Sequence, residues 1–511
     1  MYLTQCLHRM NRHSPDSPAA VDALHRLSWR ELTDRVARFG GALRNAGLQP
    51  GDRVAMLARN GTDFLVYLLG TLWAGGVLNP VNLRWTEREI GHSLENCQTR
   101  FLIFDPAFAG MVPAIRTASP SLVHVIETGS NLDAWISRSD PVEDALRQGN
   151  DLAAILYTGG TTGFPKGVML SHASLAASML GSIAAQRSPA GRRNLHVAPL
   201  FHVGALSGLL IALFSGTTSH FLPAFDALGV CETIARESID EIFLVPTMIR
   251  MVLDHPRFAE FDTASVRLIR YGASSIDGAT LDRAMLAFPN AAFVQAYGMT
   301  ELSPTATVLP PQDHGAAARA SGRLRSAGRA TPTTEVRIVD ADDVELPCGE
   351  IGEIVVRGPT VMLGYWQLPE ATAEAMRGGW MHTGDLGRMD EDGYVTVVDR
   401  LKDMIVTGGE NVYSAEVENA LSSHPDIAAL AVVAVPDRTW GERVHAVIVP
   451  RTGANPCVAE LTDYCRGRLA GYKIPRSFAF VDALPLSAAG KVLKNILRDA
   501  ANAQTSAGDS E

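Results

Sequence analysis

The segment from Tyr157 to Gly167, Tyr-Thr-Gly-Gly-Thr-Thr-Gly-Phe-Pro-Lys-Gly, combines the residue types that bind phosphate groups. Glycine lets backbone N–H groups approach an anion closely, threonine hydroxyls donate hydrogen bonds, and lysine supplies positive charge. The segment is not a Walker A loop, because Lys166 precedes a glycine and not a serine or threonine. A glycine-rich surface turn is the structural alternative, but such a turn needs neither the threonines nor the final Pro-Lys-Gly. The segment therefore predicts a phosphate-binding loop.

A second group of reactive side chains stands in Gln295-Ala-Tyr-Gly-Met-Thr-Glu301. Tyr297 offers a flat ring for a nucleotide base, Thr300 a hydroxyl and Glu301 a carboxylate. Magnesium favours oxygen ligands and commonly combines one or two carboxylates with substrate phosphates. Taken without its neighbours, Glu301 would be an ordinary surface acid. Within this motif it indicates a metal-assisted nucleotide site.

A third segment, Trp380-Met-His-Thr-Gly-Asp-Leu386, places Asp385 on a tight Thr-Gly turn. A carboxylate there can accept hydrogen bonds from both hydroxyls of a ribose. The alternative is that Asp385 only stabilises the turn, as aspartate often does.

Together these motifs resemble the adenylate-forming superfamily of acyl-CoA synthetases, adenylation domains and luciferases, and the resemblance runs in the family's order through nearly the whole chain. The chain departs from the family pattern at Gly159, where serine is usual, at Ala296, where glycine is more frequent, and at Ser487, where threonine is usual. The resemblance implies an enzyme, an AMP-forming acid–thiol ligase, with ATP and coenzyme A as co-substrates and Mg²⁺ as cofactor.

The resemblance also implies roles for individual residues. Tyr297 packs on adenine, Thr300 contacts the α-phosphate, Glu301 holds Mg²⁺, Asp385 binds the ribose with Arg400 beside it, and Lys491 enters the site during adenylation. The full set expected to bind ATP or AMP is Thr158, Gly159, Gly160, Thr161, Thr162, Gly163, Lys166, Gly272, Ala273, Ser274, Ala296, Tyr297, Gly298, Met299, Thr300, Asp385, Arg400 and Lys491. The expected catalytic residues among them are Lys491, Thr300, Glu301 and Lys166.

The same resemblance assigns three further groups of residues. The acyl pocket is expected at His202, Val203, Gly204, Gly272, Tyr297 and Gly298, although His202 could equally be a packed core histidine. Lys402 aligns with a hinge residue, and Gly408, Gly409 and Glu410 are expected to lie against the pantetheine arm of coenzyme A. Outside this context, Lys402 would be a solvated lysine and the two glycines an ordinary turn. The Gly364-Tyr-Trp366 segment matches a family segment that looks structural.

The expected reaction joins a carboxylic acid to AMP and then transfers the acyl group to coenzyme A. A medium- or long-chain fatty acid is the first expectation for the substrate, because small apolar residues follow His202. An aromatic or alicyclic acid is the alternative, and a carrier-protein thiol is the alternative acceptor. A luciferase-like oxidation and a non-catalytic nucleotide- or acyl-binding relative are the remaining readings; retention of Lys166, Glu301, Asp385 and Lys491 argues against the last.

The elements that position these residues follow an α/β pattern, in which β-branched runs alternate with stretches of helical periodicity. Strands are predicted at 53–57, 101–104, 152–157 and 266–270, and helices at 28–46 and 279–288. Strict alternation at 335–339 and 352–357 predicts an antiparallel piece. Beyond it, a strand is predicted at 393–400, a helix from Ser414, strands at 429–435 and 443–449, and a helix at 458–469. The chain is therefore expected to form a large N-terminal domain, residues 1–399, of helix-covered sheets plus this antiparallel piece, and a small mobile α+β C-terminal domain, residues 400–511.

The composition limits what the protein binds and where it resides. A net charge of −10 over 511 residues argues against a nucleic-acid partner, since phosphate backbones require concentrated basic charge. Six scattered cysteines without metal-ligand or disulfide spacing fit a reducing cytoplasm. The uncharged stretch 64–81 is broken by Gly75-Gly76 and Asn79-Pro80, so it predicts a buried helix and a short buried segment, not a transmembrane helix. The sequence leaves open whether the chain forms a homodimer.

Overall fold

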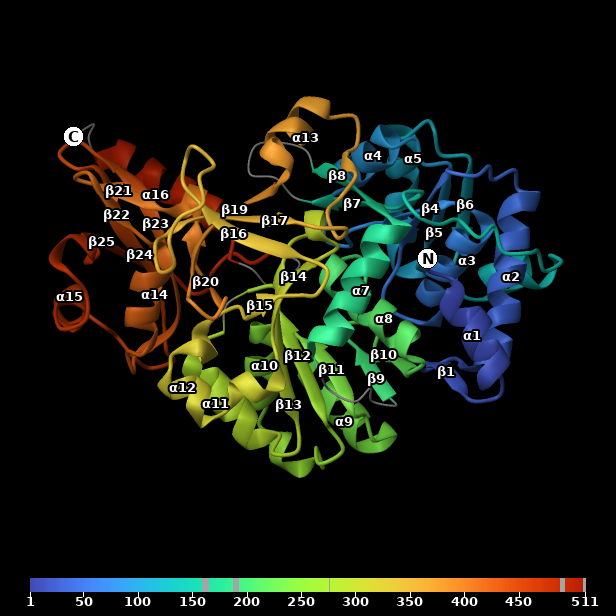
Figure 1. Cartoon of the computed structure of the whole chain (residues 1–511), viewed down its shortest axis with the longest axis horizontal. Coiled ribbons are helices and arrows are strands. Elements are labelled where there is room, and N and C mark those ends of the chain that lie inside the picture. The colour runs from blue at the N-terminus through green and yellow to red at the C-terminus, as the bar shows by residue number, and fades with distance from the viewer. Residues whose placement is uncertain (159–164, 187–192, 275, 488–491, 509–511) are drawn as a thin grey trace. The chain divides into compact units, whose positions relative to one another are not determined.

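The structure, a computed structural model, describes residues 1–158, 165–186, 193–274, 276–487 and 492–508 (Figure 1). The chain divides into two compact units. Unit 1 comprises residues 1–336 and 356–381, and unit 2 comprises residues 337–355 and 382–511. The boundary predicted at residues 399–400 concerns a hinge and stays a prediction.

Unit 1 contains two sheets. Sheet A has the strand order β15-β14-β13-β12-β11-β9-β10-β1-β2 and is parallel from β13 to β1. Its strands in chain order are β1 Pro18–Val21, β2 Arg26–Ser28, β9 Arg193–His196, β10 Thr218–Phe221, β11 Glu241–Leu244, β12 Leu268–Gly272, β13 Ala292–Gly298, β14 Thr305–Leu309 and β15 Arg329–Ala330.

Sheet B has the order β18-β8-β7-β4-β3-β5-β6, with parallel strands from β7 to β6 and antiparallel pairs at the β8 edge. Its strands are β3 Arg53–Leu57, β4 Val77–Pro80, β5 Phe101–Phe104, β6 His124–Glu127, β7 Leu152–Thr158, β8 Lys166–Ser171 and β18 Gly364–Tyr365.

Two smaller sheets contain the remaining strands. Sheet C, with its residues mostly in unit 2, has the order β16-β17-β19-β20, made of β16 Glu335–Val339, β17 Gly352–Arg357, β19 Met381–Met389 and β20 Val395–Arg400. Sheet D, wholly in unit 2, has the order β22-β21-β24-β23, with β25 pairing β24; its strands are β21 Ile405–Thr407, β22 Glu410–Val412, β23 Ile427–Asp437, β24 Gly441–Pro450 and β25 Ser477–Phe480.

Helices cover both sheets of unit 1 and pack on sheet D of unit 2. Those of unit 1 are α1 Gln5–His13, α2 Trp29–Asn45, α3 Thr62–Ala74, α4 Glu87–Asn96, α5 Val112–Ala118, α6 Ser130–Ser137, α7 His172–Gln186, α8 Val203–Ser215, α9 Ala227–Glu237, α10 Pro246–Leu253, α11 Gly278–Ala287, α12 Ala316–Ala320 and α13 Pro369–Ala375. Those of unit 2 are α14 Ser414–Ser422, α15 Val458–Arg466 and α16 Lys494–Gly508.

The core of unit 1 is layered. Helices α9, α10 and α11 cover one face of sheet A (Figure 1). Apolar side chains of β9, β11, β12 and β13 pack against these helices. Helix α7 lies on the opposite face, because Arg270 of β12 points away from that cluster and donates to Gln186 of α7. One face of sheet B is covered by α4 and α5. This two-sided cover explains why the strands are continuous apolar runs.

Capping interactions and glycines define the ends of several predicted elements. Ser28 caps α2 through a capping box with Glu31, which satisfies the first backbone donors of the helix. The uncharged stretch 64–81 becomes helix α3 followed by strand β4, as predicted, with Gly75 in the left-handed conformation at the helix end. No helix in the described part of the chain is long and apolar enough to cross a membrane.

Several predicted boundaries were wrong by one to three residues; the strand predicted at 393–400, for example, is β20 and starts at Val395. The strand expected from Val266 starts at Leu268, because its neighbour β11 begins at Glu241 and the ladder pairs these two residues. The helix expected to reach Leu469 ends at Arg466, where Gly467 follows and the chain turns back to the carbonyl of Cys465. The α/β architecture itself, with a larger N-terminal part and a smaller C-terminal part, is confirmed.

Candidate active site

The predicted phosphate-binding loop lies between two antiparallel strands of sheet B. Strand β7 ends at Thr158 and β8 begins at Lys166, and these two residues are paired in the ladder. The intervening Gly159, Gly160, Thr161, Thr162 and Gly163 lie outside the described residues. The Lys166 side chain is exposed at the start of β8. The ladder therefore brings a threonine and the predicted phosphate lysine to the same end of the hairpin.

Residues that follow Lys166 fix the base of this hairpin. A Cβ on Gly167 would lie 2.8 Å from Ile155 Cγ2 and 3.1 Å from Tyr157 Cζ, so only glycine fits there. The backbone N–H of Trp366 donates to the Gly167 carbonyl at 2.7 Å. The Trp366 indole donates to the carbonyl of Asn96 at 3.0 Å, and the hydroxyl of Tyr157 donates to the side-chain oxygen of Asn96 at 2.6 Å. The hairpin base is thus held at a fixed position against α4.

The carboxyl ends of β12 and β13 bring two further predicted groups together in sheet A. Gly272 pairs with Ala296 in parallel register, and a Cβ on Gly272 would lie 2.3 Å from the Ala296 carbonyl oxygen. After Gly272 the chain turns through Ala273, whose φ of 66° is left-handed, and exposes Ser274. Tyr297 and Gly298 end β13 beside this turn. Carboxyl ends of neighbouring parallel strands are the usual ligand-binding edge of an α/β sheet.

Glu301, which follows β13 of sheet A, accepts a hydrogen bond from a side chain of sheet B. It lies in the short 3₁₀ helix η3, Thr300–Leu302, directly after Met299, and is 6% exposed. The hydroxyl of Tyr365 donates to Glu301 Oε1 at 2.9 Å. The ammonium of Lys166 lies over the ring of the same tyrosine, 5.1 Å from its centroid. Burial raises the pKa of Tyr365 well above its usual value, so its phenol stays protonated and donates.

The surroundings of Glu301 suit a magnesium ion that is bound mainly by the phosphates of a nucleotide. A carboxylate is an oxygen ligand of the kind Mg²⁺ prefers, and the phosphate-loop lysine lies close by. Within the described residues, no three histidine, cysteine, aspartate or glutamate side chains gather as a metal site. Glu301 is therefore suited to share a metal ion with a nucleotide.

Asp385 is positioned within unit 2 by its own turn. Glu353 accepts from His382 Nδ1 at 2.8 Å and from the Gly384 N–H at 2.9 Å, while Thr383 accepts from the Asp385 N–H at 3.1 Å. Asp385 pairs with Arg400 across β19 and β20, and their side chains lie 3.3 Å apart, Nε to Oδ1. The sequence did not reveal Glu353 as the residue that organises this turn.

The predicted hinge residue Lys402 lies in the 3₁₀ helix η7, Leu401–Asp403, after β20. Its pKa is lowered, first because neighbouring protein displaces water from the ammonium and then because the Arg400 guanidinium repels it. These effects disfavour the charged form of the side chain.

Gly408 and Gly409 form the turn between β21 and β22, with left-handed φ values of 61° and 86°, and Glu410 begins β22. The Gly408 N–H donates to the Trp440 carbonyl at 2.8 Å, and a Cβ on Gly408 would lie 2.8 Å from the Trp440 ring. Arg476 lies over that ring at 4.3 Å, and Trp440 is 41% exposed. Sequence reasoning missed this tryptophan–arginine pair; a tryptophan in the polar turn Asp-Arg-Thr-Trp-Gly441 was the available signal.

The residues predicted for the acyl pocket begin helix α8. His202 is its N-cap residue, and Val203 and Gly204 form its first turn. A Cβ on Gly204 would lie 3.7 Å from the Phe243 ring of β11, so this ring faces the small side of the helix. The ring of Phe201 lies 4.4 Å from that of His202. Phe243 was missed because it is distant in sequence from every motif.

The predicted residues therefore fall in three places. Those of the phosphate hairpin, the β12 and β13 ends, Glu301 and the start of α8 belong to unit 1, and Lys166 and Glu301 meet there on Tyr365. Asp385, Arg400, Lys402 and the Gly408–Glu410 turn belong to unit 2. Lys491 lies outside the described residues.

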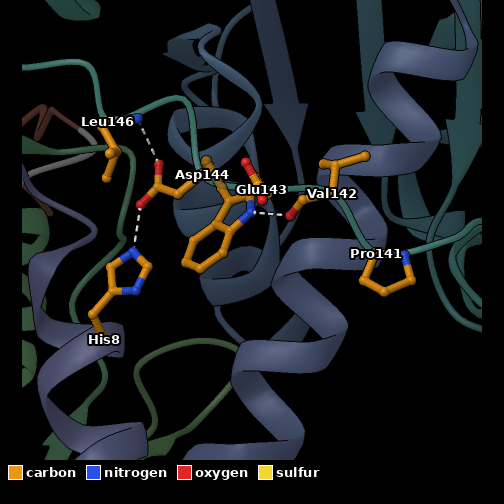
Figure 2. Close-up of a pocket in the computed structure, with 7 residues that line it drawn as sticks. His8, Pro141, Val142, Glu143, Asp144 and Leu146 are labelled. Carbon is orange, nitrogen blue, oxygen red and sulfur yellow. Dashed lines mark hydrogen bonds and ion pairs between the residues drawn. The ribbon is translucent and has the colours of Figure 1, made fainter.

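Figure 2 shows a surface pocket of unit 1 that none of the predicted residues lines. Its volume is about 490 Å³, and its walls are His8, Trp73, Pro141, Val142, Glu143, Asp144 and Leu146. His8 Nε2 lies 2.8 Å from the buried carboxylate of Asp144, and the imidazole stacks on Trp73. These contacts fasten α1 to the segment that precedes β7.

Comparison with known proteins identifies the family. The family described as AMP-binding enzyme matches residues 7–366, and the family described as AMP-binding enzyme C-terminal domain matches residues 416–491. The chain is 41% identical over 495 residues to a feruloyl-CoA synthase of an Amycolatopsis species, covering 96% of this chain and 97% of that protein. It is 37% identical to a fatty acid–[acyl-carrier-protein] ligase, ScoC, of Streptomyces coeruleorubidus, covering 96% and 94%.

Among solved structures, ATP-bound MatB from Rhodopseudomonas palustris superposes with a TM-score of 0.89 at 33% identity, covering 98% of this chain and 99% of that one. A family match over most of the chain, and relatives above 30% identity over nearly all of it, establish the family. The chain therefore belongs to the AMP-binding enzymes, in the acyl-CoA synthetase branch of the adenylate-forming superfamily, the AMP-forming acid–thiol ligases.

Proposed function

We propose that this protein converts an apolar, preferably aryl-substituted, monocarboxylic acid into its coenzyme A thioester through an acyl-adenylate, with release of AMP and pyrophosphate. One observation carries the nucleotide half of the proposal: Tyr365 contacts both the phosphate-loop lysine, Lys166, and the buried carboxylate of Glu301. Positive charge and a metal-binding carboxylate at one place suit the triphosphate of ATP.

In the first half-reaction the substrate carboxylate attacks the α-phosphorus of ATP, and pyrophosphate leaves. The chain's part is to hold two anions together: Lys166 and the hydroxyls of the Thr158–Thr162 loop bind phosphate oxygens, Thr300 contacts the α-phosphate, and Tyr297 packs on adenine. Asp385 accepts hydrogen bonds from the ribose hydroxyls, and Lys491 neutralises charge between the reactants. Mg²⁺, when bound by Glu301 and the phosphates, supplies further charge neutralisation.

In the second half-reaction a thiol attacks the acyl carbonyl, and AMP leaves. We assign the acceptor to coenzyme A, whose pantetheine arm would lie along the Gly408-Gly409 turn. Two left-handed glycines expose backbone there, and the neighbouring Trp440 ring and Arg476 guanidinium offer a stacking surface with positive charge. Between the two half-reactions, rotation of the C-terminal part about Lys402 would remove Lys491 from the active site. The same rotation would bring the Gly408-Gly409 turn into the site.

The substrate class rests on the walls of the predicted acyl pocket and on the relatives. Val203, Gly204 and Phe243 present apolar surface with a flat ring beside a helix of small residues. The feruloyl-CoA synthase relative, at 41% identity, supports an aryl-substituted acid. The fatty acid ligase relative, at 37% identity, supports a medium- or long-chain fatty acid as the second candidate, and its named acceptor supports testing a carrier protein.

The test is AMP release with ATP and Mg²⁺ across straight-chain, branched and aromatic acids, with and without coenzyme A. Turnover that requires coenzyme A and is strongest with arylpropenoic acids is the expected result. Strongest turnover with fatty acids would transfer the assignment to the second candidate. Pyrophosphate release without acyl-CoA formation would exclude coenzyme A as acceptor.

Replacement of Lys491 by alanine tests whether this lysine serves adenylation and not thioester formation. We expect ATP–pyrophosphate exchange to fall by roughly a hundredfold or more, because removing one electrostatic stabiliser of a transition state typically costs that much. Thioester formation from synthetic acyl-adenylate should change far less. Full exchange activity in the variant would contradict the role of Lys491.

We place the protein in the cytoplasm, where its six free cysteines, Cys6, Cys97, Cys231, Cys348, Cys457 and Cys465, would stay reduced. Light scattering distinguishes a monomer from the homodimer that the sequence leaves open.

A further inference from the structure

We propose that Tyr365 is a positioning residue that fixes both the Glu301 carboxylate and the Lys166 ammonium for a metal–nucleotide complex. The inference rests on the proposed function, since it takes Glu301 as the metal-binding carboxylate. The Gly364-Tyr-Trp366 segment is expected from sequence to support the fold; the geometry of Tyr365 points to a second role.

The hydroxyl of Tyr365 holds the Glu301 side chain. It donates to Oε1 at 2.9 Å, and Glu301 is 6% exposed. A buried carboxylate on three rotatable bonds can adopt several rotamers unless a partner selects one. A neutral phenol selects the rotamer without cancelling the negative charge that a cation requires. Glu301 is also fixed through its backbone, because its carbonyl accepts from the Met362 N–H at 2.8 Å.

The ring of Tyr365 holds the Lys166 side chain. The ammonium lies 5.1 Å from the ring centroid, within the range of cation–π attraction. Because the ring carries no formal charge, this contact does not cancel the positive charge that would bind phosphate oxygens. Tyr365 is thus the shared contact of the cation and the carboxylate.

Tyr365 is itself firmly held. It pairs with Val168 across β18 and β8, and its N–H donates to Thr372 Oγ1 at 2.9 Å. Gly364 has a left-handed φ of 140°, and a Cβ there would lie 2.8 Å from Thr372 Cγ2, so the approach of β18 to α13 depends on glycine. Because Tyr365 is paired with β8 and hydrogen-bonded to Glu301, it can keep Glu301 at a fixed position relative to β8.

A purely structural tyrosine offers the matched control. Tyr67 is buried in α3, donates to the Val54 carbonyl at 2.9 Å and accepts from the Asn79 N–H at 3.0 Å. Tyr67→Phe and Tyr365→Phe each remove one phenolic hydroxyl from unit 1. Only the second removes a hydrogen bond to Glu301 while keeping the ring under Lys166.

The experiment compares Mn²⁺ binding in the presence of ATP, by electron paramagnetic resonance, with the Mg²⁺ dependence of ATP–pyrophosphate exchange. Tyr365→Phe should weaken Mn²⁺ binding and raise the Mg²⁺ concentration for half-maximal exchange by roughly tenfold, the cost typical of losing a residue that orients a metal ligand. Tyr365→Leu, which also removes the ring from Lys166, should raise the KM for ATP further. Tyr67→Phe should lower the melting temperature and leave metal binding unchanged.

Unchanged Mn²⁺ affinity and Mg²⁺ dependence in Tyr365→Phe would overturn the inference, as would equal changes in Tyr67→Phe. Failure of the proposed function is distinguishable: a wild-type protein without exchange activity for any acid would overturn that proposal. The Mn²⁺ comparison between wild type and Tyr365→Phe would still decide the role of the tyrosine.

Discussion

At the scale of single residues, the candidate site relies on carboxylates whose surroundings fix them before any ligand binds. Asp385 sits on a turn whose hydrogen-bond acceptors are Glu353 and Thr383, so its orientation does not depend on Arg400 alone. Glu301 depends in the same way on Tyr365. Preorganised groups of this kind avoid reorganisation at the moment of reaction.

Asp385→Asn should weaken ATP binding with little loss of stability. The amide keeps the shape of the carboxylate but loses the charge that strengthens hydrogen bonds to ribose hydroxyls. Such bonds contribute about 1.5–3 kcal/mol, so the KM for ATP should rise by roughly ten- to a hundredfold. ATP titration of the exchange reaction measures this.

The control for that variant is Asp390→Asn. Asp390 Oδ1 accepts from the N–H groups of Asp392 and Tyr394 at 3.0 and 2.8 Å, and thus supports a β-turn in the same sheet. An unchanged KM in Asp385→Asn, or an equal rise in Asp390→Asn, would assign Asp385 to turn stabilisation only.

At the scale of elements, unit 2 fastens the segment that follows Lys491. Lys494, the first residue of α16, donates to Ser414 Oγ at 2.6 Å and pairs with Glu418 at 2.8 Å, both on α14. Ser414 donates in turn to Asp399 at 2.7 Å, next to Arg400. Before Lys491, Leu486 forms a β-bridge with Val492. Lys494 follows Lys491 by three residues and so lies within about 11 Å of it along the chain.

Lys494→Met should therefore slow adenylation, because the segment that carries the proposed catalytic lysine, Lys491, loses its anchor. A misplacement of about 1 Å can cost up to roughly a hundredfold in rate. Exchange activity should fall toward that limit, while thioester formation from preformed acyl-adenylate changes little.

Lys473→Met is the matched control for the anchor. Lys473 pairs with Glu416 of the same helix at 2.8 Å, but it stands apart from Lys491 in sequence. Adenylation should survive its replacement. Equal losses of exchange activity in the two variants would indicate that α14 pairs serve only the stability of the unit.

At the scale of the whole molecule, buried histidines make unit 1 sensitive to acid. His172, His196, His220 and His314 are at most 6% exposed. Burial lowers the pKa of His196 to about 3 and those of the other three to about 4. Between pH 6.5 and about 4 the unfolded chain binds these protons and the folded chain does not. The free energy of unfolding must then fall as the pH falls through this window.

We expect the urea-unfolding free energy to decrease from pH 6.5 to pH 5 by at most about 1.4 kcal/mol per histidine per pH unit. His196→Asn should make this dependence shallower, whatever its effect on absolute stability, because one titrating group is removed. Replacement of the exposed His13 by asparagine is the control. An unchanged slope in His196→Asn would contradict the assignment of acid sensitivity to these buried imidazoles.

Features that depend on contiguous residues could be predicted from the sequence alone. The glycine- and threonine-rich loop, the Thr-Gly-Asp turn and the Thr-Glu motif are local patterns, and the family match confirms the enzyme class that they indicated. Most strands and helices were also predictable, because burial on both faces of a sheet and helix capping leave local signatures. Several boundaries were wrong, among them those at Val266 and Leu469, where a partner strand or a single glycine decides the end.

Contacts between residues that are far apart in the sequence became apparent only in the folded structure. Tyr365 contacts Glu301, 64 positions earlier, and Lys166, which begins the neighbouring strand β8 of the same sheet. Trp440 joins Arg476 and Gly408, Phe243 faces Gly204, and Glu353 organises the turn of Asp385. Such contacts follow from sheet order and register, which bring together residues that no local pattern relates. The enzyme class could therefore be predicted from the sequence, whereas the residues that position the candidate site could be identified only from the folded structure.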